Sequence, residues 1–504
     1  MAVPRPLGLL LLVVALFGCT WALVVPPWQA PDEDVHFAYT QTLVERGELP
    51  GKGPQQVSSE QRLSMDASNT DAVVFFNERA QPDFSAEAER RWRAESKGSL
   101  RTDGGAPNAA SDYPVGYYAL ETIPYRLASS GDVLTRLYAM RLFSVLWLLA
   151  TTTGAWLLAG ELFGRNRLLQ LVTAATIGLW PMLSFMSSSI NPDGMLTALW
   201  TLSTWLGVSI LRRGLSAPRA IGLCLTAGLA LMTKATALAL VPPVAFVFAV
   251  GLWRARRRVT RRNAGWAAVA LAAFAIPVLT WVLVAHHSGR APYGQAALVS
   301  QSAPAPTTAG KPAPPPRSAG ARYFASYLWQ FYLPKLGFME DQRFVFPIIS
   351  HYPAYEVWLA SGWASFGWVN VWFPPWVYKL FFAIVLLVAA GAAVSARRGL
   401  RALRAAGGVA KRAPRTLAAF FAVTAGALLG GLHWTDFHML VDGKAPFMQG
   451  RYLLPIGALL ALVVALAVRA LPPRLRVGGA AAVLGGLVVF QLACLGLVAA
   501  RFYG

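Results

Sequence analysis

The 504-residue sequence has few cysteines and few acidic residues. Its three cysteines, Cys19, Cys224 and Cys494, each fall within an apolar stretch, which argues against a disulfide framework and against a cysteine metal site. Asp and Glu number 24 against 45 Lys and Arg, so the net charge is +21. A charge of that size would ordinarily suggest a nucleic-acid partner. The positions of the charges argue against one.

Acidic residues are absent from a set of short basic loops that separate long apolar runs. With Arg5, these loops hold 22 of the 45 Lys and Arg residues. They are the segments 165–167, 212–219, 254–262, 396–415 and 469–476. Lys and Arg concentrate in the cytoplasmic loops of membrane proteins. The sequence therefore predicts that these loops and the N-terminus are cytoplasmic, and it indicates no nucleic-acid partner.

The apolar runs predict an all-α polytopic membrane protein with about 11 transmembrane helices. The first lies within residues 1–25 and is interpreted as a signal anchor that is not cleaved. Helices 2–7 are predicted within residues 137–285 and helices 8–11 within residues 376–504. Their predicted spans are 138–160, 168–186, 194–211, 219–236, 238–253, 264–285, 376–396, 416–433, 452–469 and 477–500. Two of these spans are divided near Lys234–Pro243.

Two large segments, 26–136 and 286–375, are predicted to lie outside the cytoplasm. The first contains 17 of the 24 acidic residues. The second contains the proline-rich stretch Ser302–Gly320, which is expected to be flexible because its composition cannot bury a core. Aromatic runs on both sides of that stretch are typical of a membrane interface. An active site is therefore expected on the extracytoplasmic face.

The stretch "PDEDVHFAY", Pro31–Tyr39, follows the first apolar run directly. In one interpretation Asp32 and its neighbours are first-turn acids that complement the dipole of a helix starting near Pro31. In the other, Asp32 and His36 are four residues apart and share a helix face. A carboxylate that is partly desolvated at a bilayer surface can act as a general base. The residues alone leave both interpretations open.

Several cations and polar turns stand at predicted outer ends of spans. Lys234 is either a buried, partnered ammonium or one that reaches the interface, and Arg451 and Arg141 are either phosphate ligands or members of structural ion pairs. Asn191 and Asp193 lie in a turn, which either faces the site or only connects two helices.

A third group, Asp436, His438 and Asp442, suggests a metal. Its spacing matches no standard site, so no metal ligands are predicted.

Five motifs occur in order along the chain: "PDEDVHFAY" (31–39), "INPDG" (190–194), "TKATALALVP" (233–242), "FGWVNVWFP" (366–374) and "QGRYLLP" (449–455). On these motifs the chain resembles a bacterial domain-of-unknown-function family of polytopic GT-C-like membrane proteins. The run "DEDVHFAY" is also similar to the Asp-Glu-Val-His-Phe stretch of protein O-mannosyltransferases, with Asp34 inserted. One departure is "SDYPVGYY" (111–118), where such proteins often carry a His-Pro-Pro-x-Tyr-Tyr-like stretch.

The resemblance implies a GT-C-like bundle whose large first outer loop carries amphipathic helices. It implies an enzyme that transfers a sugar from a polyprenyl-phosphate donor to a cell-envelope glycan or lipid acceptor, by a general-base inverting mechanism at the bacterial inner membrane. In this reading Asp32 is the base, supported by Glu33 and His36. The expected substrate- and phosphate-binding residues are Lys234, Arg451, Arg141, Asn191, Asp193, Tyr452 and Gln449.

Two alternatives remain beside this interpretation. One is a lipid-linked glycan transporter or flippase, although such proteins place their ionisable groups near the bilayer midplane. The other is an O-antigen-ligase-like transferase, which would need cations more than a base. No cofactor is expected, with a divalent cation as the alternative. The sequence leaves the oligomeric state open.

Overall fold

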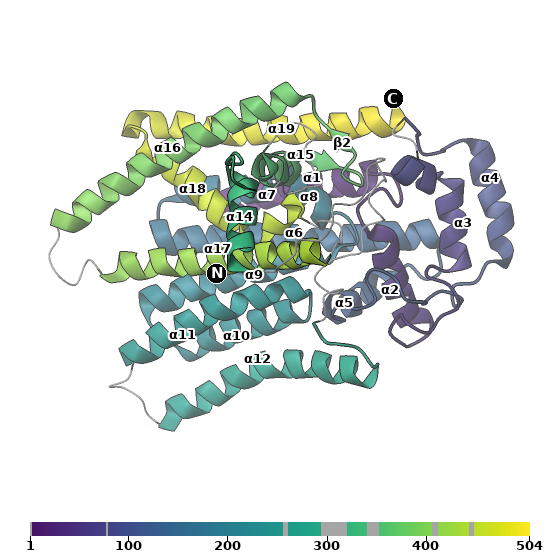
Figure 1. The fold of residues 1–504 in the computed structure, drawn as a ribbon, viewed down its shortest axis with the longest axis horizontal. Helices are drawn as coiled ribbons and strands as arrows, with labels where there is room; N and C mark the ends of the chain where they lie inside the picture. The colour runs from purple at the N-terminus through teal and green to yellow at the C-terminus, as the bar shows by residue number, and fades with distance from the viewer. Residues whose placement is uncertain are drawn as a thin grey trace.

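A computed structural model describes residues 3–76, 79–255, 261–293, 320–339, 352–405, 412–442 and 448–504. Within these ranges almost every regular element is a helix, and the long helices lie side by side (Figure 1). The prediction of an all-α membrane protein is confirmed. The proline-rich stretch Ser302–Gly320 lies outside the described residues, apart from Gly320.

Nine helices in the described ranges are long and apolar enough to cross a membrane, and a bent pair makes a tenth if it forms one span. The straight ones are α1 (Arg5–Val24), α6 (Val133–Phe163), α9 (Pro192–Arg213), η3 with α11 (Ala235–Leu240 and Val241–Ala255), α12 (Arg261–His287), α16 (Pro375–Ala405), α17 (Arg412–Val441), η6 with α18 (Gly450–Ile456 and Gly457–Ala470) and η7 with α19 (Pro473–Leu475 and Arg476–Tyr503). The remaining predicted span corresponds to α10 (Ala217–Leu231), an apolar helix of only 15 residues.

The predicted span 168–186 is not one straight helix. It consists of α7 (Arg167–Gly178) and α8 (Pro181–Ser187), whose axes differ by 58°. Pro181 is the cause, because its ring disfavours helical backbone at the preceding residue and it has no N–H to donate to a continuing helix. Trp180, at the break, has extended backbone instead, with φ −77° and ψ 115°.

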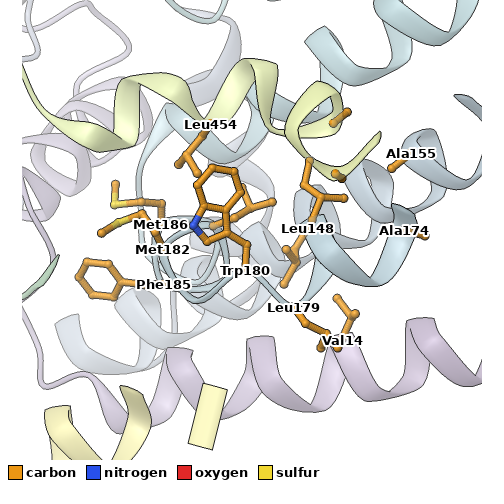
Figure 2. Close-up of a cluster of buried hydrophobic side chains, with 14 of the residues drawn as sticks. Val14, Leu148, Ala155, Ala174, Leu179, Trp180, Met182, Phe185, Met186 and Leu454 are labelled. Atoms are coloured by element: carbon orange, nitrogen blue, oxygen red, sulfur yellow. The ribbon is translucent and has the colours of Figure 1, made fainter. Parts of the chain in front are cut away.

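The bend places Trp180 in the centre of the core. Figure 2 shows its indole ring between Leu454 of η6 and the side chains of α8, with Leu148 of α6 close by. The indole N–H donates a hydrogen bond of 3.0 Å to the carbonyl of Gly362. This cluster joins α6, α8 and η6, and it therefore fixes the segments that carry the site described below.

A second break separates α10 from η3. The chain leaves α10 at Leu231, and Lys234 has extended backbone with φ −158° and ψ 143° before η3 begins. The division predicted near Lys234–Pro243 is therefore present, and it falls at Lys234 itself. A residue in extended backbone between two helices can direct its side chain away from both helix surfaces, which matters for the site.

The first loop folds into helices that lie together at one end of the bundle (Figure 1). They are α2 (Glu33–Glu45), α3 (Ser59–Ala67), the π-helical turn η1 (Ala72–Phe76), α4 (Ala86–Glu95), the 3-10 turn η2 (Ser96–Gly98) and α5 (Gly116–Leu127). Ser58 and Ser85 cap α3 and α4 by accepting hydrogen bonds from backbone N–H groups in the first turn. Helix α2 packs against α5, and α5 packs against α6.

The second loop contributes α14 (Ala321–Tyr332), the π-helical turn η4 (Tyr355–Ser361), α15 (Gly362–Ala364) and a two-stranded antiparallel hairpin of β1 (Ser365–Phe366) and β2 (Val371–Trp372). The ring of Phe366 packs against that of Trp21 in α1 in a tilted arrangement, with centroids 4.8 Å apart. The indole N–H of Trp368 donates to the Trp28 carbonyl at 3.1 Å. The two loops therefore meet at the end of α1.

Candidate active site

Asp32 occupies the N-cap position of α2 and has left-handed backbone, with φ 62° and ψ 12°. Helix α2 thus begins at Glu33, two residues after the predicted start near Pro31. Left-handed backbone costs a non-glycine residue about 1–3 kcal/mol, and such strain is often found at functional sites. The conformation separates the Asp32 side chain from that of Glu33, so the two adjacent acids have different partners.

Asp32 belongs to a chain of four alternating charges, which we call the charged quartet: Asp32, Arg451, Asp193 and Lys234. Asp32 Oδ2 accepts from Arg451 Nη2 at 2.8 Å, and Lys234 Nζ donates to Asp193 Oδ1 at 2.6 Å. Arg451 Nε and Asp193 Oδ2 lie 3.9 Å apart, which links the two pairs. All four residues are at most 6% exposed. Two carboxylates and two cations balance, so the buried group carries no net charge.

The quartet is not saturated with hydrogen bonds. Arg451 Nε and Nη1 and Asp193 Oδ2 are buried and have no hydrogen-bond partner among the described residues. Buried polar groups are nearly always satisfied, and exceptions are common where a ligand or water is received. Arg451 therefore keeps donor capacity beyond its bond to Asp32.

Two tyrosines flank Lys234. Its Nζ lies 5.6 Å from the ring centroid of Tyr113 and 5.2 Å from that of Tyr452. These are cation–π distances, and such contacts help to hold a cation away from water. Of the two alternatives for Lys234, the geometry corresponds to the buried ammonium with an acidic partner and not to one that reaches the interface.

Glu33 and Arg141 form a separate and fully satisfied pair. Arg141 Nε donates to Glu33 Oε1 at 2.7 Å, and Nη2 donates to Glu33 Oε2. The other donors of the guanidinium go to the carbonyls of Ala22, Val25 and Pro26. Glu33 Oε1 also accepts from the Ile190 N–H at 3.3 Å, and both charged residues are 0% exposed.

This pair does not belong to the quartet. Because Arg141 already donates to five acceptors, the geometry leaves it no free N–H for the predicted phosphate. These contacts favour the other interpretation of Arg141, a structural ion pair. The pair of Arg141 and Glu33 joins α6 to the end of α1, the start of α2 and the turn before α9.

His36 lies beside the quartet but contacts tyrosines. Its Nδ1 is 2.8 Å from the Tyr118 hydroxyl, and the Tyr118 ring stacks on Tyr39 with centroids 3.7 Å apart. Burial lowers the pKa of the His36 imidazole to about 3, so the ring is neutral at physiological pH. His36 can therefore orient Tyr118, but it cannot supply a positive charge.

Asn191 has two contacts, one within its own turn and one with the segment before α2. Its Oδ1 caps α9 by accepting from the Asp193 N–H at 3.0 Å, and its Nδ2 faces the Pro31 carbonyl at 3.4 Å. The turn thus begins a helix and also touches the segment that carries Asp32. Thr197 lies one turn further along α9, and its hydroxyl donates a hydrogen bond to the Asp193 carbonyl.

The "QGRYLLP" motif forms η6 and the residue before it. A Cβ on Gly450 would lie 2.1 Å from the Gly362 nitrogen and 2.3 Å from the Val357 carbonyl oxygen, so only glycine permits this approach. That contact sets the position of Arg451. Gln449 is half-buried, and its Oε1 has no hydrogen-bond partner among the described residues.

Sequence reasoning assigned no firm role to Asp34, Tyr113 or Tyr118. Burial, and next the adjacent Asp32 carboxylate, raise the pKa of the Asp34 carboxyl to about 7. Tyr113 and Tyr118 come from "SDYPVGYY", the stretch that departs from the family pattern, and the structure places both at the site. The two tyrosines that end this stretch, Tyr117 and Tyr118, match the family pattern, and they were the available signal for Tyr118.

The predicted absence of metal ligands stays a prediction. In the ranges that the structure describes, no group of three or more His, Cys, Asp or Glu side chains could hold a metal ion. Asp436 accepts a hydrogen bond from the Tyr327 hydroxyl at 2.7 Å, and His438 Nδ1 lies 2.9 Å from the Trp434 carbonyl.

Comparisons with known proteins bear on the fold. A comparison with curated protein sequences finds no match. Archaeal oligosaccharyltransferase AglB from Archaeoglobus fulgidus, in complex with an inhibitory peptide and a dolichol-phosphate, is similar at 12% identity and a TM-score of 0.50, over 98% of this chain and 55% of that one. ArnT from Cupriavidus metallidurans bound to undecaprenyl phosphate is similar at 13% identity and a TM-score of 0.44, over 98% and 74%.

The chain spans about half the length of the oligosaccharyltransferase. The likeness to the oligosaccharyltransferase, at a TM-score of 0.50, concerns the fold alone and confirms the predicted GT-C-like bundle. The sequence itself matches a family of predicted membrane proteins, DUF2142, over residues 15–460. Because that match covers most of the 504 residues, the protein belongs to the DUF2142 family.

Proposed function

We propose that the protein is a membrane glycosyltransferase that moves a sugar from a polyprenyl-phosphate donor to a glycan or lipid acceptor of the cell envelope. The site would face outward from the bacterial inner membrane, with the N-terminus in the cytoplasm. The charged quartet carries the proposal, because it sets a carboxylate suited to accept a proton beside cations suited to hold a phosphate. The shared fold with AglB, whose structure contains dolichol-phosphate, supports a donor of this class.

Arg451 and Lys234 would bind the donor phosphate. Two buried nitrogens of Arg451 have no hydrogen-bond partner in the part of the chain that the structure describes, and a guanidinium presents its N–H groups as a fork that matches phosphate oxygens. Lys234 adds a compact charge between two aromatic rings. Both cations would stabilise the phosphate as its negative charge grows during bond cleavage, which is the largest single contribution in many enzymes.

Binding of the donor would also activate Asp32. Its Oδ2 accepts from Arg451 in the structure, and a phosphate that binds this guanidinium would draw it away from the carboxylate. A carboxylate that loses a neighbouring cation has a higher pKa and becomes a better base. Donor binding and base activation would thus be coupled through Arg451.

The chemical step follows from these positions. The acceptor hydroxyl oxygen attacks the anomeric carbon from the side opposite the phosphate, and its proton passes to Asp32. The bond between the anomeric carbon and the phosphate oxygen breaks, and its electron pair leaves with the polyprenyl phosphate. One displacement at the anomeric carbon inverts its configuration.

The remaining predicted residues would position the reacting groups. Asn191 fixes Asp193, which holds Lys234, and Tyr452 flanks the same ammonium. His36 orients Tyr118. The amide oxygen of Gln449 accepts no hydrogen bond from the described residues, and it could accept one from a hydroxyl of the donor sugar. No divalent cation is needed for these steps.

Transfer of radiolabelled sugar from undecaprenyl phosphate to envelope glycans, with purified protein in lipid nanodiscs, tests the proposal. Wild type is expected to transfer the label, and Lys234→Met is expected to lose about 10²–10³ in rate. Lys97→Met is the matched control, because Lys97 is exposed on η2. Movement of the lipid between leaflets without sugar transfer would favour the transporter alternative. Use of pyrophosphate-linked donors alone would favour the ligase-like one.

A further inference from the structure

A cavity of about 540 Å³ opens beside Asp32 within the first-loop helices. Its wall contains Asp32 and Asp34 at the start of α2, Asp71, Asp112, Arg62 of α3, and Trp368 from the loop between β1 and β2. None of the other members of the charged quartet lines it. The volume is in the range of small-molecule sites.

The cavity wall has more acidic than basic side chains. It contains four aspartates and one arginine. Arg62 lies 3.4 Å from Asp71, and Arg451 binds Asp32 from outside the wall, so Asp34 and Asp112 carry the acidic excess. A concave wall of one charge sign repels ions of the same sign and attracts the opposite one. An occupant with a phosphate or carboxylate would therefore be disfavoured here.

Two wall residues present polar atoms that nothing in the described chain satisfies. Asp34 Oδ1 and Asn108 Nδ2 are both buried atoms without a hydrogen-bond partner among the described residues. The amide of Asn108 is oriented, since its Oδ1 accepts from the Ala110 N–H at 2.9 Å. One acceptor and one oriented donor can together bind a hydroxyl group, which both donates and accepts.

Asp34 is suited to such a hydroxyl for a second reason. Its raised pKa, about 7, keeps part of the population protonated at neutral pH. The carboxyl group can therefore donate as well as accept a hydrogen bond. Carboxylates with ordinary pKa values only accept.

Trp368 adds an aromatic surface. Its indole N–H donates to the Trp28 carbonyl at 3.1 Å, which restricts the rotation of the side chain. A fixed aromatic face beside hydrogen-bonding side chains matches a sugar ring, which has an apolar C–H face and a hydroxyl-lined edge.

Asp32 connects this cavity to the proposed donor site. Its carboxyl group lies in the cavity wall and also binds Arg451, whereas Arg451, Lys234 and Asp193 lie outside the wall. A donor phosphate and a cavity occupant would thus reach Asp32 from different sides. A displacement reaction needs its nucleophile and leaving group on opposite sides of the reacting carbon.

We propose that this cavity is the acceptor site, and that it takes the hydroxyl-rich end of a sugar that carries no negative charge. Neutral and amino-bearing sugars fit the wall, and phosphorylated sugars and uronic acids do not. This inference rests on the proposed function, because it names the acceptor class of the same reaction.

Binding of three soluble disaccharides to the detergent-purified full chain, followed by calorimetry, tests the inference without turnover. The probes are N,N′-diacetylchitobiose, the glucosamine disaccharide and digalacturonate. The first two are expected to bind, and digalacturonate is expected to bind at least about tenfold more weakly. Trp368→Ala should weaken chitobiose binding about tenfold or more. Trp376→Ala is the matched control, because Trp376 is 65% exposed on α16 and lies outside the cavity wall.

A second cavity variant keeps the test decisive if Trp368→Ala does not fold. Asp112→Asn should narrow the discrimination against digalacturonate about threefold or more, and Glu87→Gln, an exposed acid on α4, should not. Equal binding of digalacturonate and chitobiose, no binding of any probe, or no effect of both cavity variants would each overturn the inference. Transfer that occurs while no probe binds refutes only the acceptor cavity. Normal probe binding without transfer from any donor refutes only the proposed function.

Discussion

Asp32 and Glu33 are adjacent in the chain, yet their ion pairs differ in kind. Glu33 and Arg141 are fully buried, and every donor and acceptor of the pair is used. Asp32 and Arg451 are almost as buried. Within the described ranges, however, two nitrogens of Arg451 make no hydrogen bond, and its second acidic neighbour, Asp193, is 3.9 Å away. A saturated buried pair acts as a structural joint. An unsaturated one retains capacity for a ligand, and the following predictions test that difference.

The largest effect is expected for Asp32→Asn. Asparagine keeps the shape of the side chain but cannot take a proton, so the rate of sugar transfer should fall about 10²–10⁴-fold. Stability should fall less than in Glu33→Gln, because Asp193 still faces Arg451, and transfer is therefore compared per folded molecule. Glu87→Gln is the control in the same loop region. Transfer at the wild-type rate by Asp32→Asn would remove the base assignment and leave the acids as a helix cap.

The opposite pattern is expected for Glu33→Gln. The substitution leaves the Arg141 charge buried without its carboxylate, which typically destabilises a protein by about 3–5 kcal/mol. Thermal unfolding in detergent should therefore occur at a clearly lower temperature. Transfer per folded molecule should stay within a few-fold of wild type. A variant of wild-type stability with no transfer would show that Glu33 belongs to the reacting site.

A smaller effect is expected for Arg451→Lys. Lysine keeps the charge but loses the planar fork of donors, so affinity for undecaprenyl phosphate should fall about tenfold. Calorimetric titration of the lipid into nanodisc-embedded protein measures it. Arg91→Lys, on the exposed side of α4, is the control. Unchanged affinity in Arg451→Lys would place the phosphate elsewhere.

The smallest effect is expected for the pH dependence of stability. The pKa of Asp34 is about 7 in the folded protein and near 3.8 when unfolded, so the folded state binds the extra proton between these values. Stability from this group is therefore present below about pH 4 and is lost as pH rises toward 7. Asp34→Asn has no carboxyl group to ionise, so this loss of stability is absent from the variant. The unfolding temperature of the variant minus that of wild type should therefore be larger at pH 8 than at pH 5. A constant difference across that range would contradict the burial of the charge.

The sequence predicted most of the bundle correctly because apolar length and basic loops report membrane spans directly. The helices that could cross a membrane lie close to the predicted spans, and the division at Lys234 was predicted. The bend at Pro181 was missed, since a proline in an apolar run signals a kink without giving its angle. The short length of α10 was missed because hydropathy does not mark where a helix unwinds near a buried charge.

The site residues could also be predicted only in part from the sequence. By itself the sequence determined which polar groups stand at the ends of the spans, because charges in apolar runs are few and easy to find. Only the tertiary structure decided their partners. Arg451 reaches Asp32 across 419 positions, and the left-handed backbone at Asp32 directs one acid to the quartet while the next joins Arg141. Ion pairing depends on distances of a few ångströms between segments, and these are fixed by how helices pack and not by the order of residues.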